Sequence, residues 1–215
     1  DLTRRRGAVL VFDEVVSGFR VALGGAQERF GVTPDLAAIG KGVANGMPVS
    51  AIVGRADLLR LIEEGVFVST TFGGEALSLA AALKTVEILR RPGSFEHTHG
   101  LSRTLLDKGQ QLIAAKGLAD VVAPSGLPGH CGFVFRKSGR VDANDLRSVF
   151  QQQLIQGGIL TTGIDNFCLE HTAADVEQHL AAMGPALDDV ARAVEADSVD
   201  GLLTGRRILP IFKRN

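Results

Sequence analysis

The sequence predicts an α/β protein joined to a smaller α+β part. An apolar run, GAVLVF at residues 7–12, ends abruptly at an acidic pair, as is typical of a central parallel strand buried on both faces. Helical patterns follow, and beyond residue 118 the texture changes to short strands and turns between helices. The boundary between the two parts is expected within residues 95–118.

The elements of the first part follow in chain order. Residues 47–54 (MPVSAIVG) predict a second strand, and residues 56–65 predict a short amphipathic helix. The helix expected at residues 75–91 is apolar on nearly every side in its first half, which indicates burial. Residues 95–117 predict a long amphipathic helix.

In the second part, residues 142–158 predict a helix that stops at a glycine pair, and residues 159–172 predict either two strands or a strand and a loop. Thr172 is expected to cap a last helix, with Asp175 completing a capping box. Pro185 lies inside that pattern and is expected to kink or restart the helix.

Composition excludes several classes of protein. Hydrophobic residues make up 45% of the 215 residues, enough for a sizeable core, and the net charge is −1. This balance argues against nucleic acid or an anionic membrane as partner. No apolar run approaches the roughly 18 residues of a membrane span, and the N-terminus does not resemble a signal peptide. Two isolated cysteines, Cys131 and Cys168, favour a reducing cytoplasm, although a disulfide between them stays open.

Three short stretches could carry chemistry. Lys41 lies between two glycines in an apolar segment, and an amine in a dry site is a good nucleophile toward an aldehyde. Asp13 follows the first predicted strand at the end where open α/β sheets bind ligands. Residues 69–76 (STTFGGEA) place hydroxyls before a helix N-terminus, which favours an anion. Taken alone, each also fits a surface charge, a loop start or a helix cap.

Together, an amine, a carboxylate and phosphate donors are what pyridoxal 5′-phosphate (PLP) requires. The segment at residues 9–55 has the order D-E-V-x-x-G-F-R, G-V-x-P-D, then G-K-G ending in G-x-P-V. It closely resembles the signature region of the class III PLP-dependent aminotransferases, and most of all the glutamate-1-semialdehyde 2,1-aminomutases. The resemblance is dense over residues 7–91 and looser to about 195, where HTAADVEQHL is similar to the family's last helix.

This resemblance implies a fold-type I PLP-dependent transferase with an incomplete large domain at residues 1–95. Residues 96–117 would be a linking helix and residues 118–215 a small α+β domain. Lys41 would bond covalently to PLP, with glycines that allow close backbone approach, and Asp13 would hold the pyridine nitrogen. Val15 would pack on the ring. Thr71 would bind the phosphate group of the PLP held by the partner subunit, which implies a homodimer.

The implied activity is amino-group transfer on a small amino acid or amino-aldehyde, with Lys41 and Asp13 as catalytic residues. An aminomutase and a transaminase that uses a keto acid acceptor both remain open. The family's second phosphate loop and its ring-stacking aromatic precede the first strand and are expected to be missing here, and Glu170 replaces a small residue. The chain as given is therefore expected to hold PLP weakly or not at all, and a truncated, non-catalytic piece that keeps the dimer surface is a third alternative. No metal site is expected, since His97 and His99 would lie on different faces of their helix.

Overall fold

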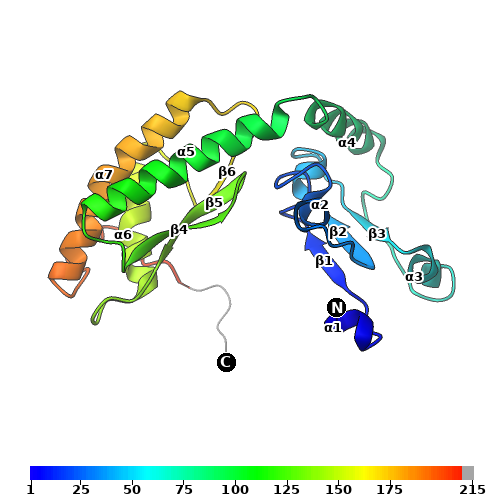
Figure 1. Ribbon diagram of the computed structural model, residues 1–215, viewed down its shortest axis with the longest axis horizontal. Coiled ribbons are helices and arrows are strands. Elements are labelled where there is room, and N and C mark those ends of the chain that lie inside the picture. The colour runs from blue at the N-terminus through cyan, green and yellow to red at the C-terminus, as the bar shows by residue number, and fades with distance from the viewer. Residues whose placement is uncertain (210–215) are drawn as a thin grey trace. The chain divides into compact units, whose positions relative to one another are not determined.

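The computed structural model describes residues 1–209. The chain divides into two compact units, one spanning Asp1–Phe95 and one that starts at Glu96. Each unit contains a three-stranded sheet, β1-β2-β3 in the first and β4-β5-β6 in the second (Figure 1). The two units are described separately below.

The first unit is a small mixed sheet with short helices. Its elements are α1 (Leu2–Arg5), β1 (Val11–Glu14), α2 (Gly25–Phe30), β2 (Leu36–Ile39), the 3-10 turn η1 (Lys41–Val43), β3 (Ala51–Gly54), α3 (Ala56–Leu59), the 3-10 turn η2 (Arg60–Ile62) and α4 (Ala76–Leu89). β1 pairs with β2 in parallel, and β3 pairs with β2 in the antiparallel direction. The parallel pair therefore ends at a common edge, beyond which α4 packs on η1 (Figure 1).

Two expectations for these strands were wrong. The first strand covers Val11–Glu14 rather than residues 7–12, and it is an edge strand of its sheet rather than a buried central one, with Val11 57% exposed. The middle strand is β2, Leu36–Ile39, for which the sequence pattern gave no strand. Its four residues, LAAI, are too few and too small to show a strand period.

Asp35 links the residues that flank the three strands of this sheet. The Asp35 carboxylate accepts a hydrogen bond from the Leu10 amide at 2.8 Å and forms an ion pair with the Arg55 guanidinium at 2.9 Å. Its backbone carbonyl also accepts from the Arg55 amide at 2.9 Å. Asp35, just before β2, thus ties together the residue before β1 and the residue after β3. These bonds hold the pKa of the Asp35 carboxyl below its ordinary value, the Leu10 amide contributing most.

The helix expected to be buried, α4, is largely exposed. Leu77 is 62% exposed and Leu83 is 75% exposed, whereas Ser78 is its one buried residue. The expectation of burial was wrong for this structure. A helix that is apolar all round is buried only where other elements cover several of its sides, and the described residues leave most of α4 uncovered. Within the described residues of the first unit, four apolar side chains are buried: Val21, Ala37, Val43 and Ala44.

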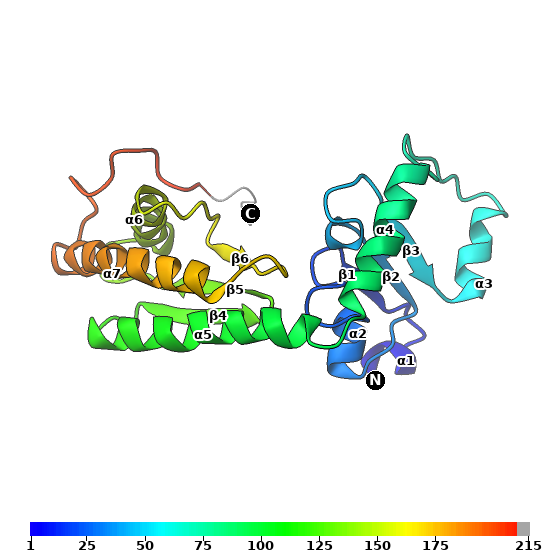
Figure 2. The ribbon, with the colours of Figure 1, turned by 90° about the horizontal axis from the view of Figure 1, so that it is seen from above.

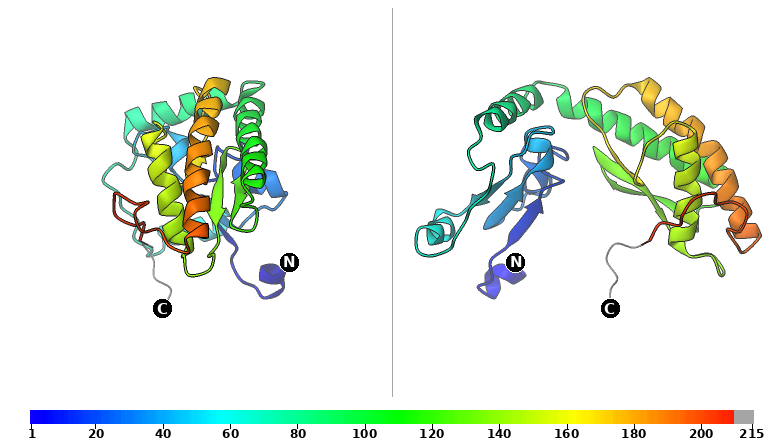
Figure 3. Two further views of the ribbon diagram at one scale, coloured as in Figure 1. Left: turned by 90° about the vertical axis from the view of Figure 1, so that its left-hand side faces the viewer. Right: turned by 180° about the vertical axis from the view of Figure 1, so that it is seen from behind.

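The second unit has a well-packed core between helices and an antiparallel sheet. Its elements are α5 (Ser94–Ala115), β4 (Val122–Leu127), β5 (His130–Phe135), α6 (Ala143–Gln156), β6 (Ile164–Asn166) and α7 (Ala173–Glu195). Figures 2 and 3 show the long helices lying against this sheet. Its largest fully buried apolar side chains are Leu105, Ile113, Leu146, Leu154, Met183 and Leu187. Helix α5, expected as a link, therefore contributes directly to this core.

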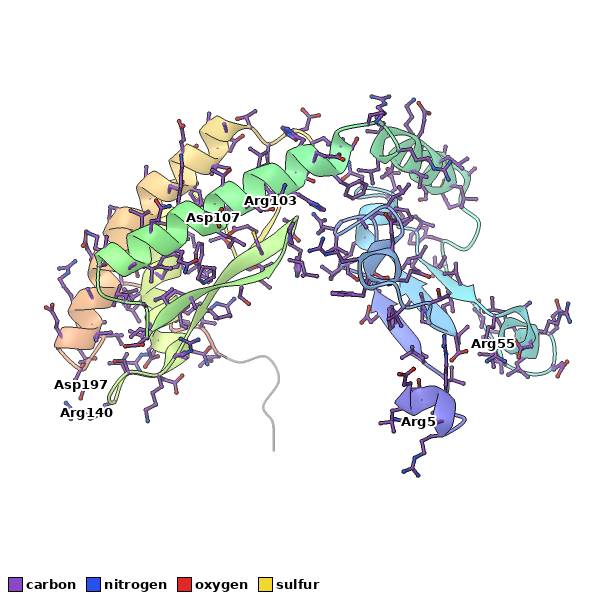
Figure 4. The ribbon with its side chains drawn as sticks, in the orientation of Figure 1. Arg5, Arg55, Arg103, Asp107, Arg140 and Asp197 are labelled. Carbon is purple, nitrogen blue, oxygen red and sulfur yellow. The ribbon has the colours of Figure 1, made fainter. Side chains whose placement is uncertain are left out.

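The last helix begins as expected and then differs. The Thr172 amide donates to Asp175 at 2.7 Å, and the capping box is confirmed. Helix α7 runs through Pro185 without restarting. Just beyond its C-terminus, Asp197 forms an ion pair with Arg140 at 2.7 Å. The two side chains lie together in Figure 4.

Cys131 is buried in the second unit and Cys168 is exposed, and both are free thiols. The disulfide left open by the sequence is therefore not formed. Among residues 1–209, no helix is both long enough and apolar enough to cross a membrane.

Candidate functional site

Asp13 and Lys41 lie at the same edge of the first sheet. Glu14 pairs with Ile39 at the carboxyl ends of β1 and β2, so Asp13 is one residue before this end and Lys41 two residues after it. Paired strands are about 4.8 Å apart, which brings both residues to one edge. The carboxyl edge of parallel strands is where open α/β sheets bind ligands.

The orientation of Asp13 is set by a local turn. One carboxylate oxygen accepts a hydrogen bond from the Val15 amide at 3.0 Å, two residues further on, and the residue is exposed. Such side chain to backbone bonds are typical of aspartate where a strand gives way to a turn. The carboxylate is therefore held at the end of β1 while it remains open to a ligand.

Lys41 has an unusual backbone conformation. Its φ is 43°, in the left-handed region, where a residue with a Cβ is strained by about 1–3 kcal/mol. Residues held in such conformations cluster at active sites and ligand clamps. The side chain is exposed, so the dry surroundings expected for this amine are not present within the described residues.

The two glycines that flank Lys41 have neighbours only at van der Waals distance. A Cβ added at Gly40 would come no closer than 3.7 Å to Val15 or Ser50, and one added at Gly42 no closer than 3.6 Å to the Gly18 carbonyl. No protein atom therefore requires glycine at either position. An exposed amine and an exposed carboxylate lie at one edge of the sheet, so the residue types that PLP requires are present there.

Thr71 is in a different setting from the other predicted site residues. It is exposed in the turn at residues 71–74, and none of the hydrogen bonds or ion pairs described for residues 1–209 joins it to Asp13 or Lys41. The nearest link is indirect, because α4, which follows that turn, packs on the segment that begins with Lys41.

The helix N-terminus beside Thr71 is already occupied. The Glu75 carboxylate accepts hydrogen bonds from the amides of Leu77 and Ser78, each at 2.7 Å. The Ser78 hydroxyl donates a third at 2.6 Å, and these bonds hold the pKa of the Glu75 carboxyl below its usual value. The chain's own carboxylate therefore caps the first amides of α4, and the predicted contact of Thr71 with a phosphate stays a prediction.

One residue of the site was missed by sequence reasoning. Glu14, the second residue of the acidic pair, is 1% exposed, and its carboxylate accepts hydrogen bonds from Ser17, Ala26 and Gln27. No residue type or spacing indicates this role, because the two donating amides lie 12 and 13 residues further along the chain.

No metal centre accompanies this edge in the described part of the chain. Across residues 1–209 there is no group of three or more His, Cys, Asp or Glu side chains placed to hold a metal ion. His130, which precedes Cys131, is hydrogen bonded instead through its Nδ1 to Asn166 Oδ1 at 2.7 Å.

Comparison with known proteins gives a consistent result. Residues 1–168 match the family model described as aminotransferase class III. The chain is 34% identical over 212 residues to the glutamate-1-semialdehyde 2,1-aminomutase of Thermomicrobium roseum, covering 89% of this chain and 47% of that protein. The chain thus spans about half the length of the curated relative it matches.

Solved structures agree on the fold. The FumI protein of Sphingopyxis sp. MTA144, solved with PLP, has a TM-score of 0.75 and 29% identity, with 91% of this chain and 46% of that chain covered. An ω-transaminase from Sphaerobacter thermophilus has a TM-score of 0.78 and 25% identity, with 88% and 46% covered. These similarities confirm the fold class predicted from the sequence, a partial fold-type I transferase of mixed α/β structure.

Proposed function

Because the chain belongs to the class III aminotransferase family, we propose that it is part of a PLP-dependent enzyme that transfers an amino group. The observation that carries this proposal is the pair at the carboxyl edge of β1 and β2. There a turn-fixed Asp13 carboxylate and a backbone-strained Lys41 lie at the same edge of the sheet.

Four residues would hold PLP. Lys41 would bond to it through its amine, Asp13 would face the pyridine nitrogen and Val15 would lie against the ring. Thr71 would bind the phosphate group of the PLP held by the partner subunit. When bound, PLP supplies an electron sink for bonds broken at the amine-bearing carbon. The first unit would then be part of the PLP-binding domain, residues 96–117 a linking helix, and residues 118–215 the small domain.

The chain's own residues perform two tasks in this scheme. The Asp13 carboxylate holds a proton at the ring nitrogen, and its bond to the Val15 amide keeps it in place. The Lys41 amine moves a proton to and from the substrate carbon, a role for which its exposed position leaves room. Both residues touch the reacting group and are therefore the catalytic residues of the proposal.

The substrate we propose is a small amino-aldehyde or amino acid, and the reaction is of the glutamate-1-semialdehyde 2,1-aminomutase type. The similarity to the Thermomicrobium roseum protein supports this choice. A transaminase with a keto acid acceptor is the alternative, and the similarity to the ω-transaminase from Sphaerobacter thermophilus supports it. A non-catalytic piece that retains the dimer surface is the remaining alternative.

We further propose a homodimer in the cytoplasm. Exposed apolar side chains on α4, including Leu77 and Leu83, and the exposed Thr71 turn support a partner subunit at this surface. The two free cysteines support a reducing compartment.

The proposal is tested by locating the cofactor bond. The intact protein is incubated with PLP, reduced with borohydride and digested, and the modified lysine is identified by mass spectrometry. We expect one equivalent on Lys41, none in Lys41→Arg, and an unchanged yield in Lys84→Arg, which alters an exposed lysine paired with Glu87. Labels scattered over surface lysines would contradict the proposal. In the same preparation, turnover of an amino-aldehyde without a keto acid acceptor would favour the mutase over the transaminase.

A further inference from the structure

Glu14 is the most completely buried charged residue of the first unit. Its side chain is 1% exposed. The carboxylate accepts hydrogen bonds from the Ser17 hydroxyl, from the Ala26 amide at 2.9 Å and from the Gln27 amide at 3.2 Å. A buried carboxylate is tolerated only where donors replace its water. Here three donors converge on one side chain, and two of them come from 12 and 13 residues further along the chain.

These bonds close the loop that follows β1. Glu14 is the last residue of β1, and the two amides belong to the first turn of α2. The loop at residues 15–24 is therefore held at both ends by one side chain. Since Val15 begins this loop, its position depends on the same bonds.

Gly18 and Gly25 lie so close to Glu14 that neither position has room for a Cβ. Gly25 has a φ of 69°, and a Cβ added there would lie 2.6 Å from the Glu14 carboxylate. A Cβ added at Gly18 would lie 2.7 Å from the Glu14 carbonyl, to which the Gly18 amide donates at 2.9 Å. Real Cβ atoms do not approach oxygen so closely, so both glycines are required by the way Glu14 is enclosed.

Glu14 and Asp13 divide two tasks between neighbouring positions. Successive strand residues point to opposite sides, so the carboxylate of Asp13 is exposed while that of Glu14 is buried. The Glu14 bonds fix the end of β1, and Asp13 is bonded in turn to the Val15 amide. A shift of the loop would therefore move the Asp13 carboxylate and the Val15 side chain together.

We propose that Glu14 is a positioning residue for the site at this edge. It acts through Asp13 and Val15, holding the carboxylate and the ring-facing side chain in place, and it does not touch the cofactor itself. This inference rests on the proposed function for its consequence on PLP, but the anchoring of the loop stands on the contacts of Glu14 alone.

The test compares two glutamates of the same region. Glu14→Gln keeps the size of the side chain but turns one acceptor into a donor that faces backbone amides. Glu28→Gln is the matched control, because Glu28 is exposed and caps the same loop through the Gly24 amide at 2.6 Å. Ser17→Ala removes one donor and leaves both amide bonds, so it serves as a milder variant if Glu14→Gln does not fold.

The first measurement is hydrogen–deuterium exchange without cofactor. Glu14→Gln should speed exchange in residues 15–24 by about tenfold or more, a change of the size expected when an anchor of local structure is lost. Ser17→Ala should have a smaller effect in the same segment, and Glu28→Gln should not affect the amides of Val15 and Val16. Unchanged exchange in Glu14→Gln, or in Ser17→Ala should Glu14→Gln fail to fold, would overturn the anchoring role.

The second measurement is PLP affinity in the intact protein, from absorbance titration below the unfolding temperature. Glu14→Gln should weaken binding about fivefold or more, with Ser17→Ala intermediate and Glu28→Gln within twofold. Faster loop exchange with unchanged affinity and an unchanged cofactor spectrum would mean that Glu14 is purely structural, and would overturn the positioning role. Absence of a Lys41 adduct in the unaltered protein would instead contradict the proposed function, while the exchange result would still decide whether Glu14 anchors the loop.

Discussion

At the residue scale, carboxylates do different work according to what surrounds them. Asp13 is exposed and held by a single amide, so it is free to meet a ligand. Glu14 is buried with three donors, and Asp35 is bonded to the Leu10 amide and to Arg55. Donors to the charged form stabilise it, which is the reason that the pKa of Asp35 is lowered. The consequence is a stability that depends on pH.

We expect Asp35 to contribute to stability only where its carboxyl is ionised. Its folded pKa lies below the ordinary value, so the contribution is complete above that value and is lost as the pH falls through the folded pKa. Asp35→Asn should therefore lower the unfolding midpoint of β1–β3 at pH 7, and the difference from the unaltered chain should shrink below about pH 4. Urea titrations at pH 7, 4 and 2.5 measure this.

The control for that prediction is Asp107→Asn, which alters an exposed carboxylate on α5 in the other unit (Figure 4). It should leave the pH dependence of β1–β3 unchanged. A difference between Asp35→Asn and the unaltered chain that is the same at pH 2.5 and at pH 7 would show that the charge of Asp35 is not what joins the strands.

At the element scale, the sequence predicts best where a pattern repeats. The helices α5, α6 and α7 each span several turns. The starts of all three, and the ends of α5 and α6, lie within two residues of the positions that the sequence predicts. The strand β2 has four small residues and shows no period. The exposure of α4 could not be predicted, because an apolar helix indicates burial without saying what covers it.

The site divides in the same way. Lys41 and Asp13 carry recognisable motifs, and the parallel register then brings them to one edge. The role of Glu14 depends on amides 12 and 13 residues away, and the capping of α4 by Glu75 depends on local geometry. Neither contact follows from residue type or spacing, so sequence reasoning could not reach them.

Helix α5 offers a test of packing with two glycines on one element. A Cβ added at Gly109 would lie 2.5 Å from the ring of Phe133 and 3.3 Å from the Met183 methyl. The ring is buried and packs against Phe150, so it has little freedom to move. Gly109→Ala should therefore destabilise the second unit by about 1–3 kcal/mol through overpacking. Urea unfolding followed by circular dichroism measures the change.

Gly100→Ala is the control within the same helix. No atom lies within 4 Å of a Cβ added at Gly100, so only helix propensity changes, and the variant should be more stable by about 0.5–1 kcal/mol. Equal effects at the two positions would mean that α5 does not approach β5 as closely as the structure has it.

At the scale of the whole molecule, the two units differ in how much apolar surface they bury. The contiguous core cluster of the described residues lies entirely between Leu105 and Val199, in the second unit. In the first unit, side chains such as Phe67, which is 91% exposed, and Ile52, which is 59% exposed, contact solvent. Burial of apolar area is the main favourable term in folding, so the first unit should open more easily.

Native-state hydrogen exchange on this chain tests that difference. Amides of β5 (His130–Phe135) and the middle of α7 should exchange only through global opening of the second unit, because Met183, Leu187 and Val190 are fully buried. Amides of β2 (Leu36–Ile39) should be protected at least about tenfold less, a gap of 1.4 kcal/mol or more in opening free energy, although β2 is the middle strand of its sheet. Comparing these two strands removes the effect of edge position, since β5 is also a middle strand. Equal protection of β2 and β5 would contradict this prediction. It would show that the first unit is as stable as the second although many of its apolar side chains are exposed.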